Sequence, residues 1–417
     1  MTEVLYENPD VLNQDPWQLP LEDLNPAQPE LFAHDRYGDY FARLREQAPV
    51  HYCRDSAFGP YWSITKYLDI KYVNTHNELF SSEPNIVLQD QAEDFKLPMF
   101  IAMDPPKHDQ QRKEVAAVAG PRNLAALEPT IRGRVCQILD SLPVGEQFDW
   151  VDRVSIELTT QMLATLFDFP FDERRKLTRW SDVATAAPMP GGIVESVEQR
   201  QSELLECLER FTQLWNERVN AAPGNDLVSM LAHGESTKNM HPMEYLGNLV
   251  LLIVGGNDTT RNSISGGVLA LNQNPEQYRK LREQPELIPN MVSEMIRWQT
   301  PLAYMRRRVL EDTEVGGQTL RAGEKVAMWY VSGNRDPDMF DDPDAFRIDR
   351  PNARKHIAFG FGIHRCMGNR VAEMQLRVLW EEILKRFHTV EVVGEPVRVP
   401  SSFVKGYLKL PVVLHPV

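Results

Sequence analysis

Phe359-Gly360-Phe361-Gly362-Ile363-His364-Arg365-Cys366-Met367-Gly368 sets one cysteine among glycines, directly before a segment of helical periodicity that runs from Asn369 to about Arg386. A thiol at a loop-to-helix junction receives backbone N–H groups and the positive end of the helix dipole, and both favour the thiolate. Such a thiolate can serve as a nucleophile, a redox centre or a metal ligand. The alternative is a buried structural cysteine, which is the usual role of an isolated cysteine.

The spacing Phe-x-x-Gly-x-x-x-Cys-x-Gly resembles the haem-binding loop of the cytochrome P450 family, in which a cysteine thiolate is the axial ligand of the iron. The resemblance implies that Cys366 ligates haem b (iron protoporphyrin IX) and that dioxygen is a co-substrate. It further implies that Phe359 shields the sulfur, that Gly362 turns the loop at positive φ, and that Gly368 lets the next helix approach the porphyrin.

The composition indicates which classes of protein are compatible with this chain. The chain has 417 residues, 42% of them apolar, which is enough for a large core, and its net charge of -14 argues against nucleic-acid binding. No C-x-x-C pair occurs among Cys53, Cys136, Cys207 and Cys366, so zinc and dithiol sites are disfavoured and reduced thiols are expected. The N-terminus lacks a signal-peptide pattern, and the apolar run 249–254 is far shorter than the ~20 residues of a membrane span. We expect a cytoplasmic, bacterial-type enzyme.

Length alone would favour two or three domains, but the resemblance implies one mainly α domain over residues 1–417, a helical bundle with a long central helix and a small β-rich part. Residues 1–35 are predicted as an extended lead-in. Periodicity and turn signals predict the following elements: a helix at 40–47, strands at 50–52 and 61–64, an irregular loop at 83–103, helices across 107–272 with breaks at 188–192 (a possible lid) and 223–224, a long helix at 242–272, helices at 275–283 and 287–298, a hairpin with strands at 313–315 and 318–320, an irregular stretch at 332–358, and β structure at 389–417.

One face of the predicted long helix changes character along its length. It is apolar at Leu251 and Val254, has no side chain at Gly255, and becomes polar at Asp258 and Thr259. Each of two adjacent glycines costs about 1 kcal/mol in a helix interior, which the close approach of a flat ligand would offset. The alternative is a helix–helix crossing. The segment resembles the oxygen-binding groove of the same family, which implies that Thr259 hydrogen-bonds dioxygen and a water while Asp258 relays protons.

Further positions match residues that hold the cofactor or the fold in this family. The propionates of the haem would be bound by four residues: His108, Arg112, Arg306 and His364. Arg307 or Arg308 could take the place of Arg306, and the alternative for each is a solvated surface charge. The order of Glu294, Arg297 and Arg350 resembles the buried Glu-Arg-Arg triad of the family, a structural role.

The resemblance also implies partners and a substrate class. We expect no fused reductase domain, so a ferredoxin and a ferredoxin reductase would supply the electrons. The ferredoxin would dock on a group of basic residues near the cysteine, and the alternative is that these are ordinary solubilising charges. The group consists of Lys107, Lys113, Arg354, Lys355, His356, Arg365 and Arg370. The predicted substrate pocket is apolar, which suits a hydrocarbon: Phe100, Met103, Leu251, Val254, Gly255, Leu302, Met305 and Phe403.

Several longer segments, among them 252–263, 296–302, 363–366 and 403–407, resemble a bacterial subfamily that hydroxylates medium-chain alkanes at the terminal carbon. We therefore expect a monomeric monooxygenase acting on alkanes or similar aliphatic and alicyclic substrates. The alternatives are hydroxylation of fatty acids or terpenoids at other positions, a peroxide-driven enzyme, and a non-catalytic haem sensor or carrier. The Asp258-Thr259 pair argues against the peroxide-driven enzyme.

Overall fold

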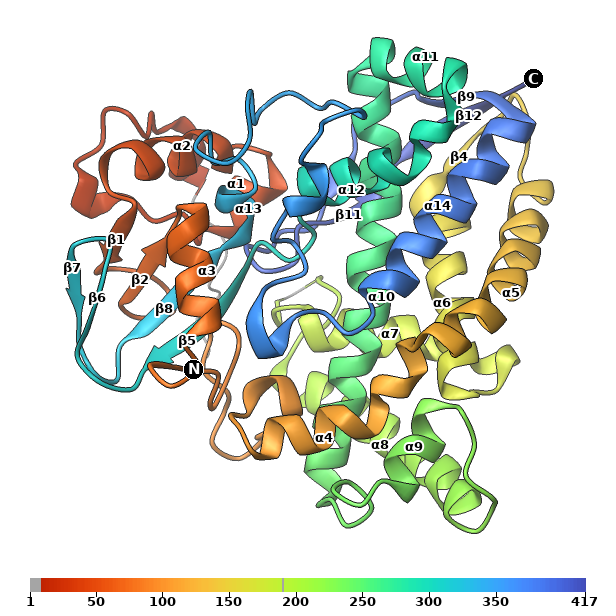
Figure 1. Cartoon of the computed structure of the whole chain (residues 1–417), viewed down its shortest axis with the longest axis horizontal. Helices are drawn as coiled ribbons and strands as arrows, with labels where there is room; N and C mark the ends of the chain where they lie inside the picture. The colour runs from red at the N-terminus through yellow and green to blue at the C-terminus, as the bar shows by residue number, and fades with distance from the viewer. Residues whose placement is uncertain (1–8, 190) are drawn as a thin grey trace.

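The computed structural model describes residues 9–189 and 191–417, and it is organised around the long helix α10 (Pro242–Gln273). This helix has 32 residues, so it is about 48 Å long. It begins with proline at its first position, and the side chain of His241 accepts a hydrogen bond from the N–H of Met243. Nine helices surround it in the described part of the chain (Figure 1): α4 (Lys107–Val115), α5 (Pro121–Asp140), α6 (Glu157–Phe167), α7 (Arg175–Thr185), α8 (Val197–Val219), α9 (Leu227–His233), α11 (Pro275–Glu283), α12 (Ile288–Gln299) and α14 (Asn369–Arg386).

A five-stranded sheet lies beside this helical part, on the left in Figure 1. Its strands run in the order β1 (Val50–Cys53), β2 (Tyr61–Ile64), β8 (Lys325–Trp329), β5 (Tyr304–Val309) and β3 (Phe80–Ser81). Only the β2–β8 pair is parallel within this sheet. Strands β2 and β8 are buried on nearly every residue, as expected for a sheet covered on both faces.

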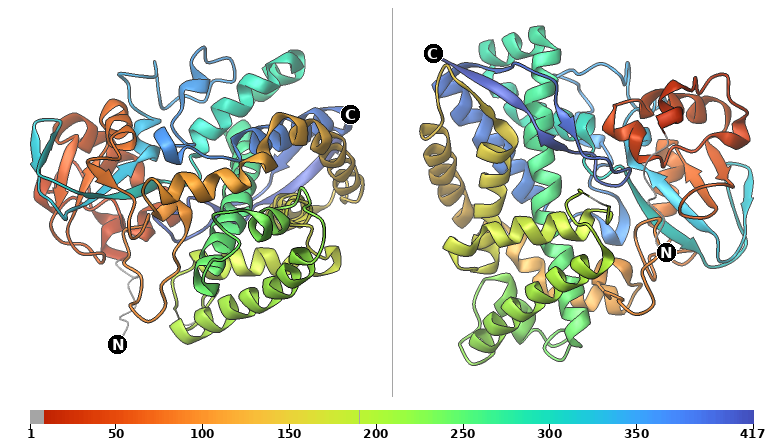
Figure 2. Two further views of the ribbon diagram at one scale, coloured as in Figure 1. Left: turned by 60° about the horizontal axis from the view of Figure 1, so that its bottom comes forward. Right: turned by 180° about the vertical axis from the view of Figure 1, so that it is seen from behind.

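Three smaller β units complete the fold (Figure 2). They are the hairpin β6 (Thr313–Val315) and β7 (Gln318–Leu320), the pair β10 (Val397–Arg398) and β11 (Tyr407–Lys409), and the three-stranded sheet β4 (Gln147–Asp149), β12 (Pro411–Pro416) and β9 (Phe387–Val392). The C-terminal β units bring residues 399–408, far along the chain, back against the central helix.

The apolar core follows α10 along both of its halves. Its first half packs Leu246, Leu249 and Ile253 against α6 to α9, and its second half packs Ile264 and Val268 against α12 and α14. The middle of the helix, around residues 251–259, is only partly covered by side chains, and it is there that the site lies. None of the helices in the described part of the chain is long and apolar enough to cross a membrane.

Most predicted elements are confirmed by the structure. The predicted long helix is α10, the helix after the cysteine is α14 with the predicted bounds, and the hairpin strands are β6 and β7. The break near 188–192 lies between α7 and α8, although Pro190 is outside the described residues.

Three predictions differ from the structure, one of them being the irregular loop 83–103, which contains the short helix η3 (Phe100–Ala102). The first eight residues lie outside the described part of the chain, and the remainder of the predicted extended lead-in contains three short helices: η1 (Pro9–Asn13), η2 (Leu21–Asp23) and α1 (Pro29–Ala33). Proline at the first position of α1, with Leu31 and Phe32 buried, explains that helix. The irregular stretch 332–358 overlaps α13 (Tyr330–Gly333) and contains η8 (Ala353–Lys355). Strand β5 was not predicted, since its three consecutive arginines obscure the alternation of a strand.

Candidate active site

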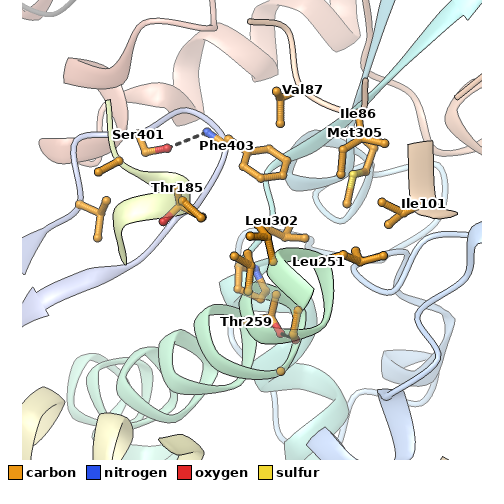
Figure 3. A pocket seen from close by; sticks show the side chains of 18 of the residues that line it. Ile86, Val87, Ile101, Thr185, Leu251, Thr259, Leu302, Met305, Ser401 and Phe403 are labelled. Atoms are coloured by element: carbon orange, nitrogen blue, oxygen red, sulfur yellow. Dashed lines mark hydrogen bonds between the residues drawn. The ribbon is translucent and has the colours of Figure 1, made fainter. Parts of the chain in front are cut away.

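A cavity of about 1210 Å³ lies against the middle of α10 (Figure 3). Its walls come from segments far apart in the chain. They are the middle of α10, the loop before α14, the irregular loop 83–103, the connection between α7 and α8, and residues 399–403. Cys366 lines one side of this cavity, and Thr259 and Gly255 line another.

The loop that presents Cys366 is held by its own backbone. The N–H of Cys366 donates to the carbonyl oxygen of Phe359 at 2.8 Å. Gly362 has φ of +66°, and a Cβ there would lie 2.4 Å from the carbonyl oxygen of Asn74 in α3 (Tyr67–Thr75). Only glycine fits this position, because an L side chain would be strained and would clash. The predicted positive φ at Gly362 is therefore confirmed, and Phe359 and Gly368 also line the cavity.

The thiol of Cys366 is subject to opposing influences. Desolvation by the surrounding protein raises its pKa, although the residue is exposed to the cavity, while a hydrogen bond from the backbone N–H of Gly368 and the charges of Arg112 and Arg365 act in the opposite direction. The sequence predicts the N–H groups and the cations, but not the desolvation that outweighs them. A bound metal ion would reverse the balance, since a coordinating thiol loses its proton outright.

The glycine pair of α10 divides into two roles. Gly255 lines the cavity, and a Cβ on it would meet nothing within 4 Å. A Cβ on Gly256 would instead lie 2.6 Å from Cδ2 of Leu163 in α6. The two interpretations of the sequence therefore both apply, open space for a ligand at Gly255 and a helix crossing at Gly256. Thr259 faces the cavity, and its hydroxyl donates to the carbonyl oxygen of Gly255 at 2.9 Å.

Asp258 is fully buried and does not line the cavity. Its carboxylate accepts hydrogen bonds from Ser181 at 2.9 Å and Thr185 at 3.3 Å, both on α7. Arg261 lies 3.0 Å from it and also pairs with Asp182 at 2.7 Å. Burial raises the pKa of Asp182, which is a quarter exposed. The network links the buried acid beside Thr259 to the protein surface.

A group of cationic and donor side chains borders the cavity on the side of the cysteine loop. Arg112, Arg307 and His364 line it. Burial lowers the pKa of Arg112 and Arg307, and it lowers the pKa of His364 to about 2. The ring of His108 lies 4.2 Å from that of His364, centroid to centroid. Nε2 of His108 and Nδ1 of His364 are buried without a hydrogen-bond partner among the described residues.

Arg306 does not join this group. Its guanidinium pairs with Asp90 at 2.6 Å and donates to the carbonyl oxygen of Val87, and it does not line the cavity. Alternation along β5 explains the difference, because successive side chains of a strand point to opposite faces. Arg307, which the sequence analysis gave as an alternative to Arg306, is the arginine that lines the cavity.

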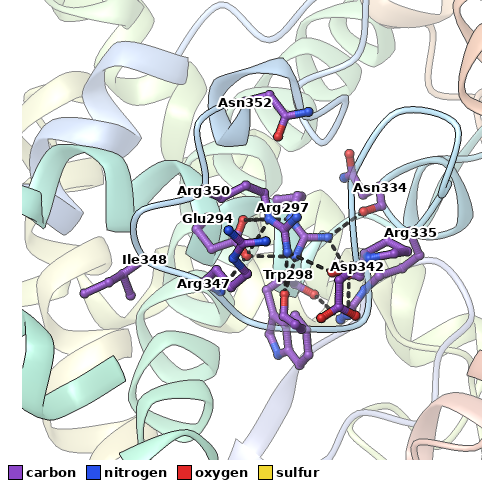
Figure 4. A network of polar contacts seen from close by, with 12 residues as sticks. Glu294, Arg297, Trp298, Asn334, Arg335, Asp342, Arg347, Ile348, Arg350 and Asn352 are labelled. Carbon is purple, nitrogen blue, oxygen red and sulfur yellow. Dashed lines mark hydrogen bonds and ion pairs between the residues drawn. The ribbon is translucent and has the colours of Figure 1, made fainter. Parts of the chain in front are cut away.

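The predicted triad forms a buried ion cluster (Figure 4). Glu294 accepts from Nε of Arg297 at 2.7 Å and from Nε of Arg350 at 3.1 Å, and all three residues are at most 1% exposed. The remaining guanidinium N–H groups donate to backbone carbonyls of the irregular stretch, those of Asn334, Pro343, Ala345, Asp341 and Asp342. The cluster thereby fixes a segment that has little regular structure of its own.

The rest of the cavity wall is mostly apolar, although polar side chains such as Asp90, Gln91 and Arg200 also line it. Of the predicted substrate-pocket residues, seven line the cavity, namely Phe100, Leu251, Val254, Gly255, Leu302, Met305 and Phe403, and Met103 does not. Met103 is buried in the neighbouring apolar cluster. Ile86, Val87, Ile101 and Thr185 also line the cavity and were not predicted. The apolar residues among them lie in the irregular loop 83–103, which gives no periodic signal, and Thr185 reaches the site only through the packing of α7 on α10.

The residues present fit a haem. A large cavity has a thiol on one side and, on another, a helix face without a side chain at Gly255. Buried guanidinium groups and unpartnered imidazole nitrogens at its border are suited to the two carboxylates of a haem. The predicted basic cluster near the cysteine is only partly a surface feature. Lys107, Lys113, Arg354, Lys355, Arg365 and Arg370 are exposed, with Lys107 paired to Glu244 at 2.8 Å, but His356 is buried.

Comparisons with known proteins agree with this geometry. The family model described as cytochrome P450 matches residues 126–409. The structure of cytochrome P450-153 from Novosphingobium aromaticivorans is 46% identical and superimposes with a TM-score of 0.88, over 96% of this chain and 100% of that one. Linalool 8-monooxygenase from Pseudomonas putida is 36% identical over 402 residues, 93% of this chain and 98% of its own length. The methyl-branched lipid omega-hydroxylase of Mycobacterium bovis is 32% identical over 414 residues, 95% of this chain and 96% of its own length.

Proposed function

The chain belongs to the cytochrome P450 family and is a monooxygenase, and we propose that it hydroxylates the terminal carbon of medium-chain alkanes or similar aliphatic and alicyclic molecules. The observation that carries the proposal is the lining of the cavity, which includes Cys366 and Thr259 and is otherwise mostly apolar. The similarity to an omega-hydroxylase and the resemblance of several segments to terminal alkane hydroxylases support the choice of the terminal carbon.

Cofactor binding is assigned to the residues at the cysteine end of the cavity. Cys366 is proposed as the iron ligand, with Arg112, Arg307, His108 and His364 holding the propionates. When bound, the haem supplies the activation of dioxygen and the transfer of one oxygen atom to a C–H bond. Gly255 and Gly368 leave room for it, because neither carries a side chain on the cavity wall.

Proton supply is assigned to Thr259 and Asp258. The hydroxyl of Thr259 is the polar group of the pair that faces the cavity, so it is placed to pass a proton to dioxygen or to an ordered water there. Asp258 sits behind it and accepts a hydrogen bond from Thr185, which also lines the cavity. Arg261 joins Asp258 to the quarter-exposed Asp182, and because a guanidinium keeps its proton, the two carboxylates are the groups that would exchange protons with the surface. The roles follow from the sequence resemblance, and the observed contacts support a path from surface to cavity.

The apolar wall is proposed to select the terminal carbon. Methyl C–H bonds are stronger than those of the adjacent methylenes, so geometry must override intrinsic reactivity. Leu302 and Phe403 stand above Thr259, with Leu251 beside them (Figure 3). Such a wall excludes water and favours a substrate chain that lies extended, with one end near the reacting position. None of these three side chains is charged, so they do not favour a polar group on the substrate.

Electrons are proposed to come from a ferredoxin and its reductase, with the ferredoxin docking on the exposed cations around the cysteine loop, and the enzyme is proposed to be a cytoplasmic monomer. The test is charge reversal of Lys113 and Arg365, both exposed. Reduction by the ferredoxin should slow strongly at low salt and less so at high salt, because screening weakens such attraction. Arg279→Glu, on α11 and 76% exposed, is the control. An unchanged reduction rate in the double reversal contradicts this docking surface.

The experiment for the activity is product analysis after reconstitution with a ferredoxin, its reductase and octane. The proposal expects mostly 1-octanol. Mostly internal alcohols would contradict terminal hydroxylation while leaving the monooxygenase. An intact haem spectrum without any oxidised octane, but with oxidised linalool or fatty acid, would contradict the alkane substrate and favour hydroxylation of terpenoids or fatty acids.

A further inference from the structure

Lys405 is a buried cation outside the catalytic machinery. It is 9% exposed, and no carboxylate in the described part of the chain lies within 4.0 Å of its ammonium. Removing an ammonium from water without an ion pair costs free energy, so a lysine at such a position requires other polar contacts. Those contacts identify what the side chain does.

The ammonium of Lys405 lies at the C-terminal end of α12. It donates to the carbonyl oxygen of Gln299 at 2.8 Å and to that of Trp298 at 3.3 Å. These carbonyls belong to the last turn of the helix, which lacks intrahelical donors and carries the negative end of the helix dipole. The helix end therefore supplies the partial negative charge that a carboxylate would otherwise supply.

Backbone contacts bind the same residue to the same helix end. The N–H of Lys405 donates to the carbonyl oxygen of Pro301 at 2.9 Å, and Nε2 of Gln299 donates to the carbonyl oxygen of Lys405 at 2.8 Å. Oε1 of Gln299 accepts from the hydroxyl of Tyr407 at 3.0 Å, and the N–H of Tyr407 donates to Asn262 of α10 at 3.1 Å. The segment 405–407 is thus joined to both α12 and α10.

The turn just before Lys405 forms part of the cavity wall. The N–H of Ala303 donates to the carbonyl oxygen of Phe403 at 2.9 Å, and Leu302 pairs with Val404 in an isolated β-bridge. Phe403 and Leu302 both line the cavity, on the side that faces Thr259 (Figure 3). Any shift of this turn relative to α12 therefore moves two wall residues relative to the reacting position.

We propose that Lys405 is a positioning residue for regioselectivity, whose ammonium fixes the 401–404 turn to the end of α12 so that Phe403 and Leu302 set how far a chain reaches toward Thr259. The inference rests on the proposed function for its substrate. Lys405 touches neither the cavity nor the residues that bind the cofactor. Its effect is on the position of the wall.

The surroundings of Lys405 predict that its effect depends on pH. Burial lowers its pKa to about 7, the charges of Arg335 and Arg398 act in the same direction, and Asp35, itself paired with Arg398 at 3.0 Å, acts against them. The ring of Tyr37 also faces it at 5.3 Å from its centroid, and burial raises the pKa of Tyr37 and of the nearby Tyr407, so neither ionises near neutrality. The amine of Lys405 is therefore protonated below about pH 7 and becomes neutral above it. Loss of the charge weakens its interaction with the carbonyl end of α12.

The test compares the full-length, haem-loaded wild type with Lys405→Met, Lys405→Arg and, as a control, Lys409→Met on the exposed face of β11. With octane, we expect the ratio of terminal to internal alcohols to fall about three- to tenfold in Lys405→Met, because small displacements of positioning groups have large effects on rates. Lys405→Arg and Lys409→Met should stay near wild type. The wild-type ratio should decline from pH 6 to pH 8, and that of Lys405→Met should not change.

Hydrogen exchange provides a second readout that needs no turnover. Lys405→Met should accelerate amide exchange in residues 399–407 and in the last turn of α12, and leave residues 242–260 unchanged. Gln299→Met removes the reciprocal bond and should act in the same direction if Lys405→Met does not fold.

A wild type that makes internal alcohols contradicts the proposed function, not this inference. Unchanged exchange together with an unchanged product ratio in Lys405→Met overturns the inference, as does a pH-independent wild-type ratio.

Discussion

Gly255 and Gly256 are consecutive residues of α10, yet one faces the cavity and the other is pressed against a neighbouring helix. A Cβ on Gly255 would meet nothing within 4 Å, whereas one on Gly256 would lie 2.6 Å from the side chain of Leu163. The same pair of residues therefore serves both the site and the packing of α10 on α6. This division explains why two glycines persist in a helix interior, where each is costly.

Alanine at these two positions should separate the two roles. Gly255→Ala should be at least as stable as the wild type without cofactor, with a gain of up to about 1 kcal/mol from helix propensity. Gly256→Ala should be less stable than Gly255→Ala by about 1–3 kcal/mol, because Leu163 must move. Denaturant unfolding of the two variants measures the difference. Equal stabilities would contradict the assignment, as would full hydroxylase activity in Gly255→Ala with reduced activity in Gly256→Ala.

Replacing a residue of the buried ion cluster should lower the free energy of unfolding far more than replacing an exposed charge near it. Arg350→Met leaves Glu294 with one fewer partner in a fully buried site and should cost about 3–5 kcal/mol in unfolding free energy. Arg347→Met is the matched control, because Arg347 is 37% exposed and its guanidinium lies 3.6 Å from an exposed aspartate. It should change stability by at most about 1 kcal/mol. Similar losses in the two variants would refute the structural role of the triad.

Acid should destabilise the protein partly through His356. Burial lowers the pKa of His356 to about 3, with Arg297 and Arg365 acting in the same direction. The unfolded chain has an ordinary histidine pKa near 6.5, so between about pH 3 and 6.5 it binds a proton that the folded chain does not. The unfolding free energy should therefore fall with decreasing pH, by about 1.4 kcal/mol per unit well below 6.5 from this residue alone.

Replacing His356 should remove that contribution. His356→Asn should reduce the slope of unfolding free energy against pH between pH 4.5 and 6, whatever its effect on stability at pH 8. His388→Asn, at an exposed position of β9, is the control. An identical slope in wild type and His356→Asn would show that the buried imidazole is not kept neutral.

Much of this fold and site could be predicted from the sequence, because the informative segments are local. The Cys366 loop, the long helix with its Gly255–Thr259 face, and the Glu294–Arg297 pair each carry their signal within about ten residues. The family resemblance then predicts that the cysteine loop and the middle of the long helix meet at one site and that the Glu294–Arg297 pair is buried, and the structure agrees.

What could not be predicted depends on contacts between distant segments. Arg306 and Arg307 are equivalent in sequence, and only the register of β5 against β8 decides which one faces the cavity. Desolvation raises the pKa of the Cys366 thiol, although the residue is exposed to the cavity, and this desolvation depends on the packed surroundings of the loop. Thr185 reaches Asp258 because α7 packs on α10, and no local pattern near Thr185 reports that contact.

Removing the hydroxyl of Thr259 should uncouple electron use from product formation. Thr259→Ala should consume NADH through the redox partners at a rate near wild type, while alcohol formed per NADH falls by about tenfold or more, as for the loss of a proton-transfer group. Thr212→Ala is the control, because Thr212 makes the same hydroxyl-to-carbonyl bond on the exposed surface of α8. Unchanged coupling in Thr259→Ala would contradict its role in proton supply.

The central claim is that Cys366 holds the iron of a haem in this cavity. The most direct test is the spectrum of the reduced carbon monoxide complex of the wild type, Cys366→Ser and the control Cys136→Ser, whose thiol does not line the cavity. The account predicts a thiolate-type spectrum in the wild type and in Cys136→Ser, and its loss in Cys366→Ser. A full thiolate-type spectrum in Cys366→Ser would contradict the account.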